Sequence, residues 1–148
     1  PPAAVRFEGP GPATTVAAFD PGGTDTHQSV TIPTGLANGV YRVRLVLGDA
    51  QNSASNSRTL EVIPRLDSPV GVSTTVVEGD NVHRLTIDGA RLNGSDVRAV
   101  LDGATYQRGA NANPTQFVLT LGRLLDAGTH RIALNVNGQV SRTITFEI

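Results

Sequence analysis

The sequence predicts an all-β protein built from two copies of one domain, and three observations lead to this fold class. Val, Thr and Ile supply 39 of the 148 residues, and β-branched side chains favour strands. Gly and Pro supply 25 more, about 17 % of the chain against a usual value of about 12 %, which predicts frequent turns. The third observation is that one pattern of apolar strands occurs twice along the chain.

The clearest strand of the first copy is predicted at residues 40–47. Tyr41, Val43, Leu45 and Leu47 alternate with polar positions that include Arg42 and Arg44, so one face of this strand is apolar. The polar, turn-rich tract 49–56 follows it. Four shorter strands are predicted around it, at Val5–Phe7, Val16–Phe19, Ser29–Ile32 and Thr59–Ile63.

The second copy is predicted to hold about seven short strands in 84 residues, a spacing typical of an immunoglobulin-like sandwich. A turn at Glu78–Asn81 joins the first two, and a short helical turn is expected at Leu121–Leu125. The strands are expected at Val72–Val77, Val82–Asp88, Ala99–Leu101, the residues around Tyr106, Phe117–Leu121, His130–Val136 and Thr143–Ile148.

The two copies align segment by segment, at offsets that change only between segments. The identical triplets Ser57–Thr59 and Ser141–Thr143 match at an offset of 84, which predicts a hairpin five residues longer in the first copy. Upstream, Phe7–Gly9 matches Leu101–Gly103. Between these segments the offset is 89, and it places Val30, Ile32, Leu36, Gly39, Val43, Leu45 and Leu47 on Leu119, Leu121, Leu125, Gly128, Ile132, Leu134 and Val136. Insertions confined to loops indicate duplicated domains.

A boundary near Pro64 and Arg65 gives two predicted immunoglobulin-like domains, residues 1–63 and 64–148. The first copy has no counterpart of residues 65–94, so its sandwich is predicted to lack its two N-terminal strands. A half-finished sandwich exposes strand edges and an apolar face, and we expect something outside this chain to cover them. Upstream residues of the same polypeptide are favoured, because a chain that starts at Pro1 without Met is expected to be a segment; strand donation by a neighbouring subunit is the alternative.

From the side chains that could take part in catalysis or ligand binding, the sequence predicts no catalytic residue, no cofactor-binding residue and no metal ligand. The chain has no Cys, which excludes disulfides, thiolate chemistry and Cys-type zinc sites. His27, His83 and His130 have no metal-ligand spacing and are interpreted as ordinary strand or loop histidines, with His130 packing where the first copy has Tyr41. Asp20–Asp25 carries two carboxylates and is interpreted as a turn rather than a cation loop.

Composition narrows the class of partner further. The net charge of -1 gives no electrostatic footprint for nucleic acid or an anionic membrane. All 12 basic residues are Arg, which, with abundant Ala, Gly and Val, indicates a GC-rich bacterial coding sequence. These Arg residues are spread through both copies and partly balanced by acids, which favours a solvated sheet face over a partner-facing patch. The charged tip Glu78–Asp80 is interpreted as a hairpin turn. Phosphate-binding fingerprints are not matched by the glycines, namely Gly9, Gly11, Gly22 and Gly23.

Two segments carry a resemblance to a known family. Val30–Pro33 with Gly35–Val43, ending in Ser55–Ser57 and Leu60–Val62, resembles immunoglobulin-like domains of the IPT/TIG type, as does Leu85–Leu92 followed by Val100–Gly103. The step from an apolar strand through Pro and Gly-Leu to Gly-x-Tyr-Arg-Val is similar to the C-terminal tandem of tail-terminator (cap) proteins from bacterial contractile injection systems. The immunoglobulin-like motif is structural, so the resemblance implies no functional residues.

The expected function is therefore a non-catalytic structural and interaction module, the peripheral part of an injection-system or phage-tail-like cap protein. Its expected partners are proteins, and self-assembly into a larger particle is expected. No nucleic-acid partner, no small-molecule substrate and no insertion into a membrane is expected. The alternative is an adhesion or accessory module of a secreted or surface bacterial protein. The sequence leaves the compartment open between a particle-associated cytoplasmic location and an extracellular one.

Overall fold

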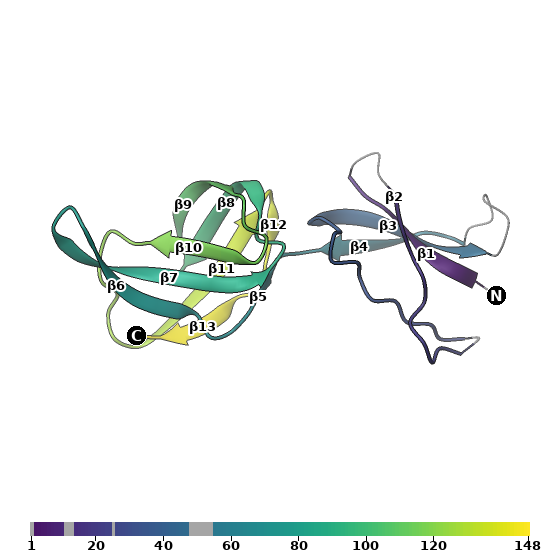
Figure 1. Ribbon diagram of the computed structural model, residues 1–148, viewed down its shortest axis with the longest axis horizontal. Helices are drawn as coiled ribbons and strands as arrows, with labels where there is room; N and C mark the ends of the chain where they lie inside the picture. The colour runs from purple at the N-terminus through teal and green to yellow at the C-terminus, as the bar shows by residue number, and fades with distance from the viewer. Residues whose placement is uncertain (1, 11–13, 25, 48–54) are drawn as a thin grey trace. The chain divides into compact units, whose positions relative to one another are not determined.

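The computed structural model describes residues 2–10, 14–24, 26–47 and 55–148, and within them the chain forms thirteen strands and no helix (Figure 1). Every strand pair is antiparallel. The chain divides into two compact units, residues 1–62 and 63–148, here called unit 1 and unit 2. The predicted all-β class is thereby confirmed.

Unit 1 contains one four-stranded sheet with the strand order β2-β1-β3-β4. Its strands are β1 (Pro2–Glu8), β2 (Thr14–Ala17), β3 (Gly39–Leu47) and β4 (Arg58–Val62). Its small core consists of Val5, Phe7, Leu36, Tyr41 and Val62, all buried.

Unit 2 contains two sheets that share one core. The first has the order β10-β7-β5, with β6 also paired to β7, and the second has the order β12-β11-β8-β9, with β13 paired to β11. The first consists of β5 (Arg65–Leu66), β6 (Gly71–Val77), β7 (Asp80–Ala90) and β10 (Gln116–Thr120). The second consists of β8 (Gly94–Leu101), β9 (Ala104–Asn111), β11 (Thr129–Val136), β12 (Gln139–Val140) and β13 (Ile144–Glu147).

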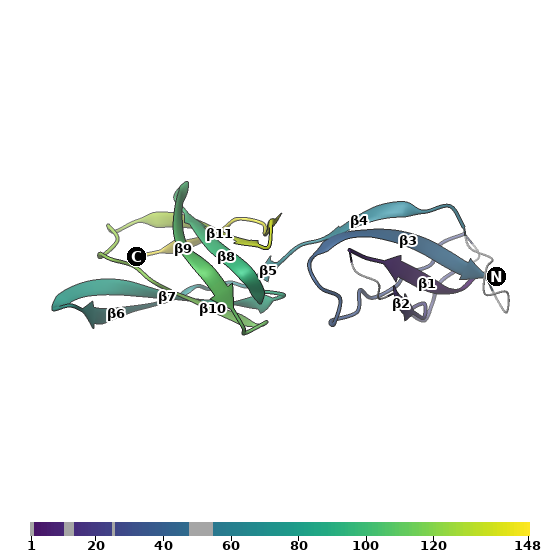
Figure 2. The same ribbon diagram turned by 90° about the horizontal axis from the view of Figure 1, so that it is seen from above.

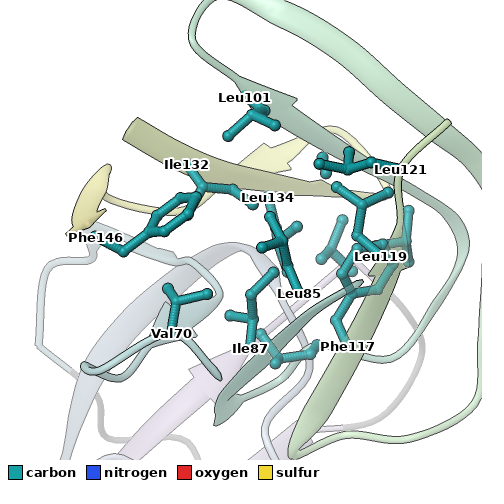
Figure 3. Packing of buried hydrophobic residues seen from close by; sticks show 14 of the residues in the cluster. Val70, Leu85, Ile87, Leu101, Phe117, Leu119, Leu121, Ile132, Leu134 and Phe146 are labelled. Atoms are coloured by element: carbon teal, nitrogen blue, oxygen red, sulfur yellow. The ribbon is translucent and has the colours of Figure 1, made fainter. Parts of the chain in front are cut away.

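The core of unit 2 lies between its two sheets (Figures 2 and 3). Leu85 and Ile87 of the first sheet pack in one cluster with Leu101, Ile132 and Leu134 of the second, and all five are essentially inaccessible to solvent. Burial of such side chains contributes about 25 cal/mol for each Å² of apolar surface removed from water. Two antiparallel sheets around a shared core are consistent with a β-sandwich.

Three hairpins of unit 2 close through two-residue turns that end in Gly. Glu78–Gly79, Asp102–Gly103 and Asn137–Gly138 all have positive φ at both residues, between 49° and 93°. This backbone conformation defines the type I′ turn, whose twist matches that of the strands it joins. The turn predicted at Glu78–Asn81 is confirmed at Glu78 and Gly79, whereas Asp80 and Asn81 belong to β7.

The sheet of unit 1 has the same pairing pattern as part of the second sheet of unit 2. Phe7 lies opposite Val43 in unit 1, and Leu101 lies opposite Ile132 in unit 2. The matches of Phe7 with Leu101 and of Val43 with Ile132 are therefore confirmed by register. Strands β2-β1-β3-β4 correspond in order to β9-β8-β11-β13.

The predicted offset of 84 for the last strand of each unit is wrong, and the strand register gives 86. Tyr41 pairs with Leu60, whereas its counterpart His130 pairs with Phe146. The intervening hairpin is thus three residues longer in unit 1 rather than five; its residues 48–54 lie outside the described part of the chain. The identical Ser-Arg-Thr triplets gave the wrong offset because these three residues are polar and do not report which residues of the strand face the core.

A serine bracket supports the corrected offset. In unit 1, the Leu45 N–H donates to Ser55 Oγ (3.0 Å) and the Ser55 N–H donates to the Leu45 carbonyl (3.0 Å). In unit 2, Leu134 and Ser141 make the same two bonds at 2.9 and 2.8 Å. Ser55, and not Ser57, is therefore the counterpart of Ser141.

The strand predicted at Ser29–Ile32 is not formed. Its counterpart in unit 2 is β10, in which Leu119 pairs with Leu85 of β7. The described residues of unit 1 hold no counterpart of β7, so residues 29–32 have no ladder to join. Val30 nevertheless packs against the core of unit 1, as a residue of a covering strand would.

The helical turn expected at Leu121–Leu125 is also wrong. The Leu121 N–H donates to the His83 carbonyl (2.9 Å), and the His83 N–H donates to the Arg123 carbonyl (3.1 Å). The backbone groups of Leu121 and Arg123 therefore bond to His83 of β7 rather than to each other. The two-residue strands β5 and β12 went unpredicted because two residues are too few to show alternation.

Truncating Leu134 is expected to destabilise unit 2 strongly. Leu134 is fully buried between the sheets, whereas Arg131 on the same strand is exposed. Leu134→Ala should lower the free energy of unfolding by about 2–5 kcal/mol, and Arg131→Ala should change it by no more than about 0.5 kcal/mol. Urea denaturation of the two variants measures both values, and equal losses would show that the faces of β11 are assigned wrongly.

Candidate functional site

His130 lies at the centre of a polar cluster in unit 2 that contains a charged pair. Its Nδ1 lies 2.7 Å from Asp102 Oδ2, and its Nε2 lies 2.8 Å from the carbonyl oxygen of Asp126. The second oxygen of Asp102 accepts a hydrogen bond of 2.9 Å from the Arg131 N–H. Both ring nitrogens face acceptors, so both can be satisfied only when each carries a proton. The geometry therefore favours the imidazolium form.

The charges of this cluster reinforce one another. The hydrogen bond that His130 donates to Asp102 raises the pKa of His130, and the bond that it donates to the Asp126 carbonyl raises this pKa further. In return, the bond from His130 and the Arg131 N–H lower the pKa of Asp102. The ring also packs on Phe146, with centroids 5.6 Å apart. The cluster thus ties the turn at Asp102 and the loop at Asp126 to the start of β11.

Unit 1 makes the same tie with a group that is neutral. Tyr41, the counterpart of His130, donates its hydroxyl to the carbonyl of Ala37 (2.8 Å), again four residues upstream. Gly9 makes room for the ring, since a Cβ there would lie 2.2 Å from Tyr41 Cε1. Glu8 stands where unit 2 has Asp102 and lies 3.6 Å from Arg44 Nε. The shared task of the position is to pin a loop.

A hollow of about 760 Å³ adjoins this cluster on the outward face of the second sheet. Its lining includes two charged residues, Asp102 and Arg131, and two hydroxyls, those of Thr143 and Thr145. Within the described residues, no hydrogen bond joins either hydroxyl to a histidine or a carboxylate. The hollow therefore offers a polar contact surface.

The other histidines hold separate turns. His83 Nδ1 accepts a hydrogen bond of 2.9 Å from the Leu125 N–H, and the exposed His27 donates its N–H to Thr24 Oγ1 (3.0 Å). Across the described ranges, no group of three or more His, Cys, Asp or Glu side chains could hold a metal ion.

The remaining candidate loops are organised as turns. Asp20 accepts a hydrogen bond of 3.0 Å from the Thr31 hydroxyl, and its N–H donates to the Ser29 carbonyl (2.8 Å). Asp25 and Gly11 lie outside the described residues. Of the other glycines considered as phosphate-loop residues, Gly9 packs against Tyr41, and Gly22 sits in a turn with a φ of 91°.

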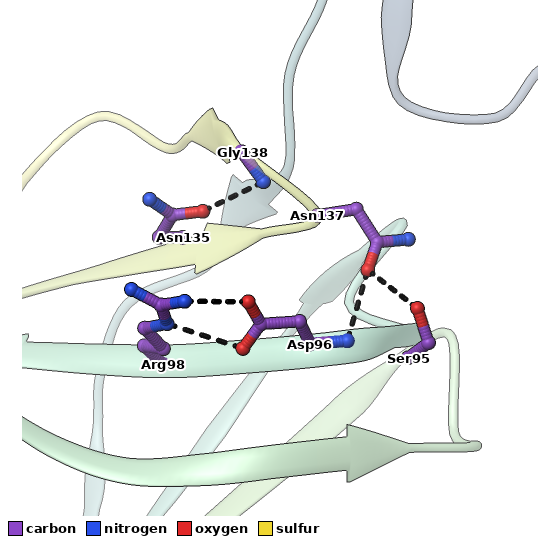
Figure 4. Close-up of polar contacts among 6 residues, drawn as sticks. All are labelled: Ser95, Asp96, Arg98, Asn135, Asn137 and Gly138. Carbon is purple, nitrogen blue, oxygen red and sulfur yellow. Dashed lines mark hydrogen bonds and ion pairs between the residues drawn. The ribbon is translucent and has the colours of Figure 1, made fainter.

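A second polar cluster braces the turn between β11 and β12 (Figure 4). Asn137 Oδ1 accepts hydrogen bonds from the Asp96 N–H (2.9 Å) and the Ser95 hydroxyl (3.2 Å). Asp96 also receives two bonds from Arg98, at 3.1 and 2.7 Å, which raise the pKa of Arg98. Sequence reasoning missed this brace, because its partners lie about 40 residues apart.

Unit 1 presents an apolar face that is only partly covered. Leu45 is 37 % exposed, whereas its counterpart Leu134 is 0 % exposed. Ile32 is 38 % exposed, whereas its counterpart Leu121 is 2 % exposed. A hollow of about 320 Å³ lies at this face, lined by Val5, Phe19, Thr26, Gln28, Val30, Val43 and Leu45. The side chain of Leu47 lies outside the described part.

Comparison of the chain with protein-family models and with curated proteins found no match. A search of the described residues for a helix long and apolar enough to cross a membrane also found none.

The His130 cluster is expected to make unit 2 depend on pH. The folded-state pKa of His130 is raised above 6.5, so its contribution to stability is complete below about pH 6.5 and is lost as the pH rises through the folded value. Asp102 has a lowered pKa, so its contribution is lost only as the pH falls below 3.8 and through its own folded value. An NMR titration of His130 should show a midpoint above 6.5, and Asp102→Asn should lower it.

His130→Tyr is the matched control, because Tyr41 shows that a phenol can make the bond to the carbonyl four residues upstream. This variant should lose most of the change in unfolding free energy seen between about pH 6 and about pH 9. A His130 midpoint at or below 6.5 in both the original chain and Asp102→Asn would contradict this account of the cluster.

Proposed function

We propose that the chain is a tandem of immunoglobulin-like domains that acts as a non-catalytic structural and protein-binding module of a larger assembly. The observation that carries the proposal is the open apolar face of unit 1, at which Leu45 is 37 % exposed although its buried counterpart occupies a core. Such a face costs solubility unless another protein layer covers it.

The use of the polar groups supports a structural role. His130, Asp102, Ser141 and Asn137 all hold turns or loops through hydrogen bonds of 2.7–3.2 Å. Tyr41 and Ser55 do the same work at the matching positions of unit 1. Side chains that are used alike in both units are explained by the fold rather than by a reaction.

The tandem immunoglobulin-like interpretation is supported by the two units together. Unit 2 has two antiparallel sheets around one core, and unit 1 repeats four strands of its second sheet in the same order. Seven or more short strands in a unit of this size are typical of the immunoglobulin-like sandwich.

Unit 2 offers a further surface for protein contact at β6. This strand has seven residues without charge or proline, and Val72, Val76 and Val77 are between 39 and 63 % exposed. Within the described residues its outer edge pairs with no other strand. Unpaired edges of this kind accept strands from other chains. With the resemblance to tail-terminator proteins, these features favour the peripheral part of a contractile-injection-system or phage-tail-like cap.

Antibodies raised against residues 63–148 test the location. On particles from a bacterium that carries this sequence, gold-labelled antibody should decorate one end of each tube-and-sheath particle in electron micrographs. Antibody pre-absorbed with the purified chain is the control. If the antibody labels the cell surface and leaves the particles unlabelled, the cap assignment is overturned. That result would support the alternative, an adhesion or accessory module of a surface protein.

A further inference from the structure

Unit 2 shows how the matching face is covered when both layers are present. In unit 2, the matching face of the second sheet is covered by β10 and β7, whose Leu119 and Leu85 pair with each other and lie at 1 and 0 % exposure. Val30 of unit 1 stands at the position of Leu119 and already packs on the core. The neighbour that Leu85 supplies in unit 2 has no counterpart in the described residues of unit 1.

The chain order of unit 2 shows where that neighbour belongs. Strands β6 and β7 form a hairpin closed by Glu78 and Gly79, and only residues 91–93 separate β7 from β8. The counterpart of β8 is β1, as the register of Phe7 and Leu101 shows. A β7-like strand that leads into β1 through such a short connection would lie next to residues 29–32.

We propose that the open face of unit 1 is the seat of an antiparallel β-hairpin, supplied by the same polypeptide immediately ahead of β1. The second strand of the hairpin pairs with residues 29–32 and converts them into a strand. Its inward positions carry apolar side chains, as Leu85 and Ile87 do in unit 2, and fill the hollow beside Val43 and Leu45. The inference rests on the duplicated-sandwich part of the proposed function and is independent of the assembly to which the tandem belongs.

The size and chemistry of the hollow fit this occupant. Val5, Phe19, Val30, Val43 and Leu45 supply the apolar walls of the hollow, which has a volume of about 320 Å³. Thr26 and Gln28 are its polar lining residues, and both are exposed. An apolar strand face is matched to such a surface, whereas a charged ligand would find no ionic partner among the lining residues.

The test grafts the unit 2 hairpin onto unit 1 in the full chain. A copy of residues 65–97 is placed directly ahead of Ala4, so that it enters β1 at the point where it enters β8 in unit 2. The chain contains no Cys, so a single Leu45→Cys substitution reports on the face through its rate of reaction with a thiol reagent. The graft should slow the labelling of Leu45→Cys at least about tenfold.

Two controls make the result specific. Val40→Cys, on the opposite face of β3 and 53 % exposed, should react at the same rate with and without the graft. A graft in which the copies of Leu85 and Ile87 are replaced by Asp should leave Leu45→Cys as reactive as in the original chain. If the covalent connection of the graft to β1 misplaces the hairpin, a synthetic peptide of residues 69–90 added to the original chain should still slow the labelling of Leu45→Cys.

Unchanged labelling with both the graft and the peptide would overturn the proposal. Sedimentation of the original chain as a dimer in which Leu45→Cys is already protected would overturn it in favour of a second copy as the cover. Neither result bears on where gold-labelled antibody binds a particle, so a failure here is distinguishable from a failure of the cap assignment.

Discussion

The structure depends on one constraint, namely that a β-sheet with an apolar face is stable only when a second layer covers that face. Unit 2 meets the constraint with its own strands: Leu85 and Ile87 of one sheet close over Ile132 and Leu134 of the other, and all four are inaccessible. Unit 1 repeats the sheet without the described counterpart of the first layer. The exposure of Leu45 and the unpaired state of residues 29–32 follow from that single difference.

Comparison of the units separates what packing fixes from what can vary. The serine bracket is kept in detail at Leu45 and Leu134. At the buried Leu134, an amide without a partner would cost about 1–3 kcal/mol. The loop pin at Tyr41 and His130 keeps its acceptor but changes its donor from a phenol to an imidazole. With Asp102 beside it, that change introduces a charge into unit 2 that unit 1 lacks at this position, and so a dependence on pH.

Much of the fold could be predicted from local patterns, and the failures share a cause. The alternation along residues 40–47 and the Gly-ended turn at residue 79 are local signals, and both appear as expected. Residues 29–32 carry a strand pattern but lack a partner, which no local signal reveals. His130 and Asp102 are 28 residues apart in the sequence. The alignment matches His130 with Tyr41 and Asp102 with Glu8, but it does not show that His130 and Asp102 are in contact. Only the pairing of β8 with β11 brings these two side chains together.

Amide hydrogen exchange in the full chain tests the central claim. This claim is that the two units contain equivalent sheets, and that only the sheet of unit 2 is covered by a second layer. The Leu45 and Leu134 N–H groups make the same hydrogen bond to a serine hydroxyl, at 3.0 and 2.9 Å, so the bond itself does not distinguish them. Exchange through local opening follows the burial around each bond, and the Leu134 amide should exchange at least about 100-fold more slowly than that of Leu45. Equal protection of the two amides would contradict the account, because it would mean that the face of unit 1 is already covered.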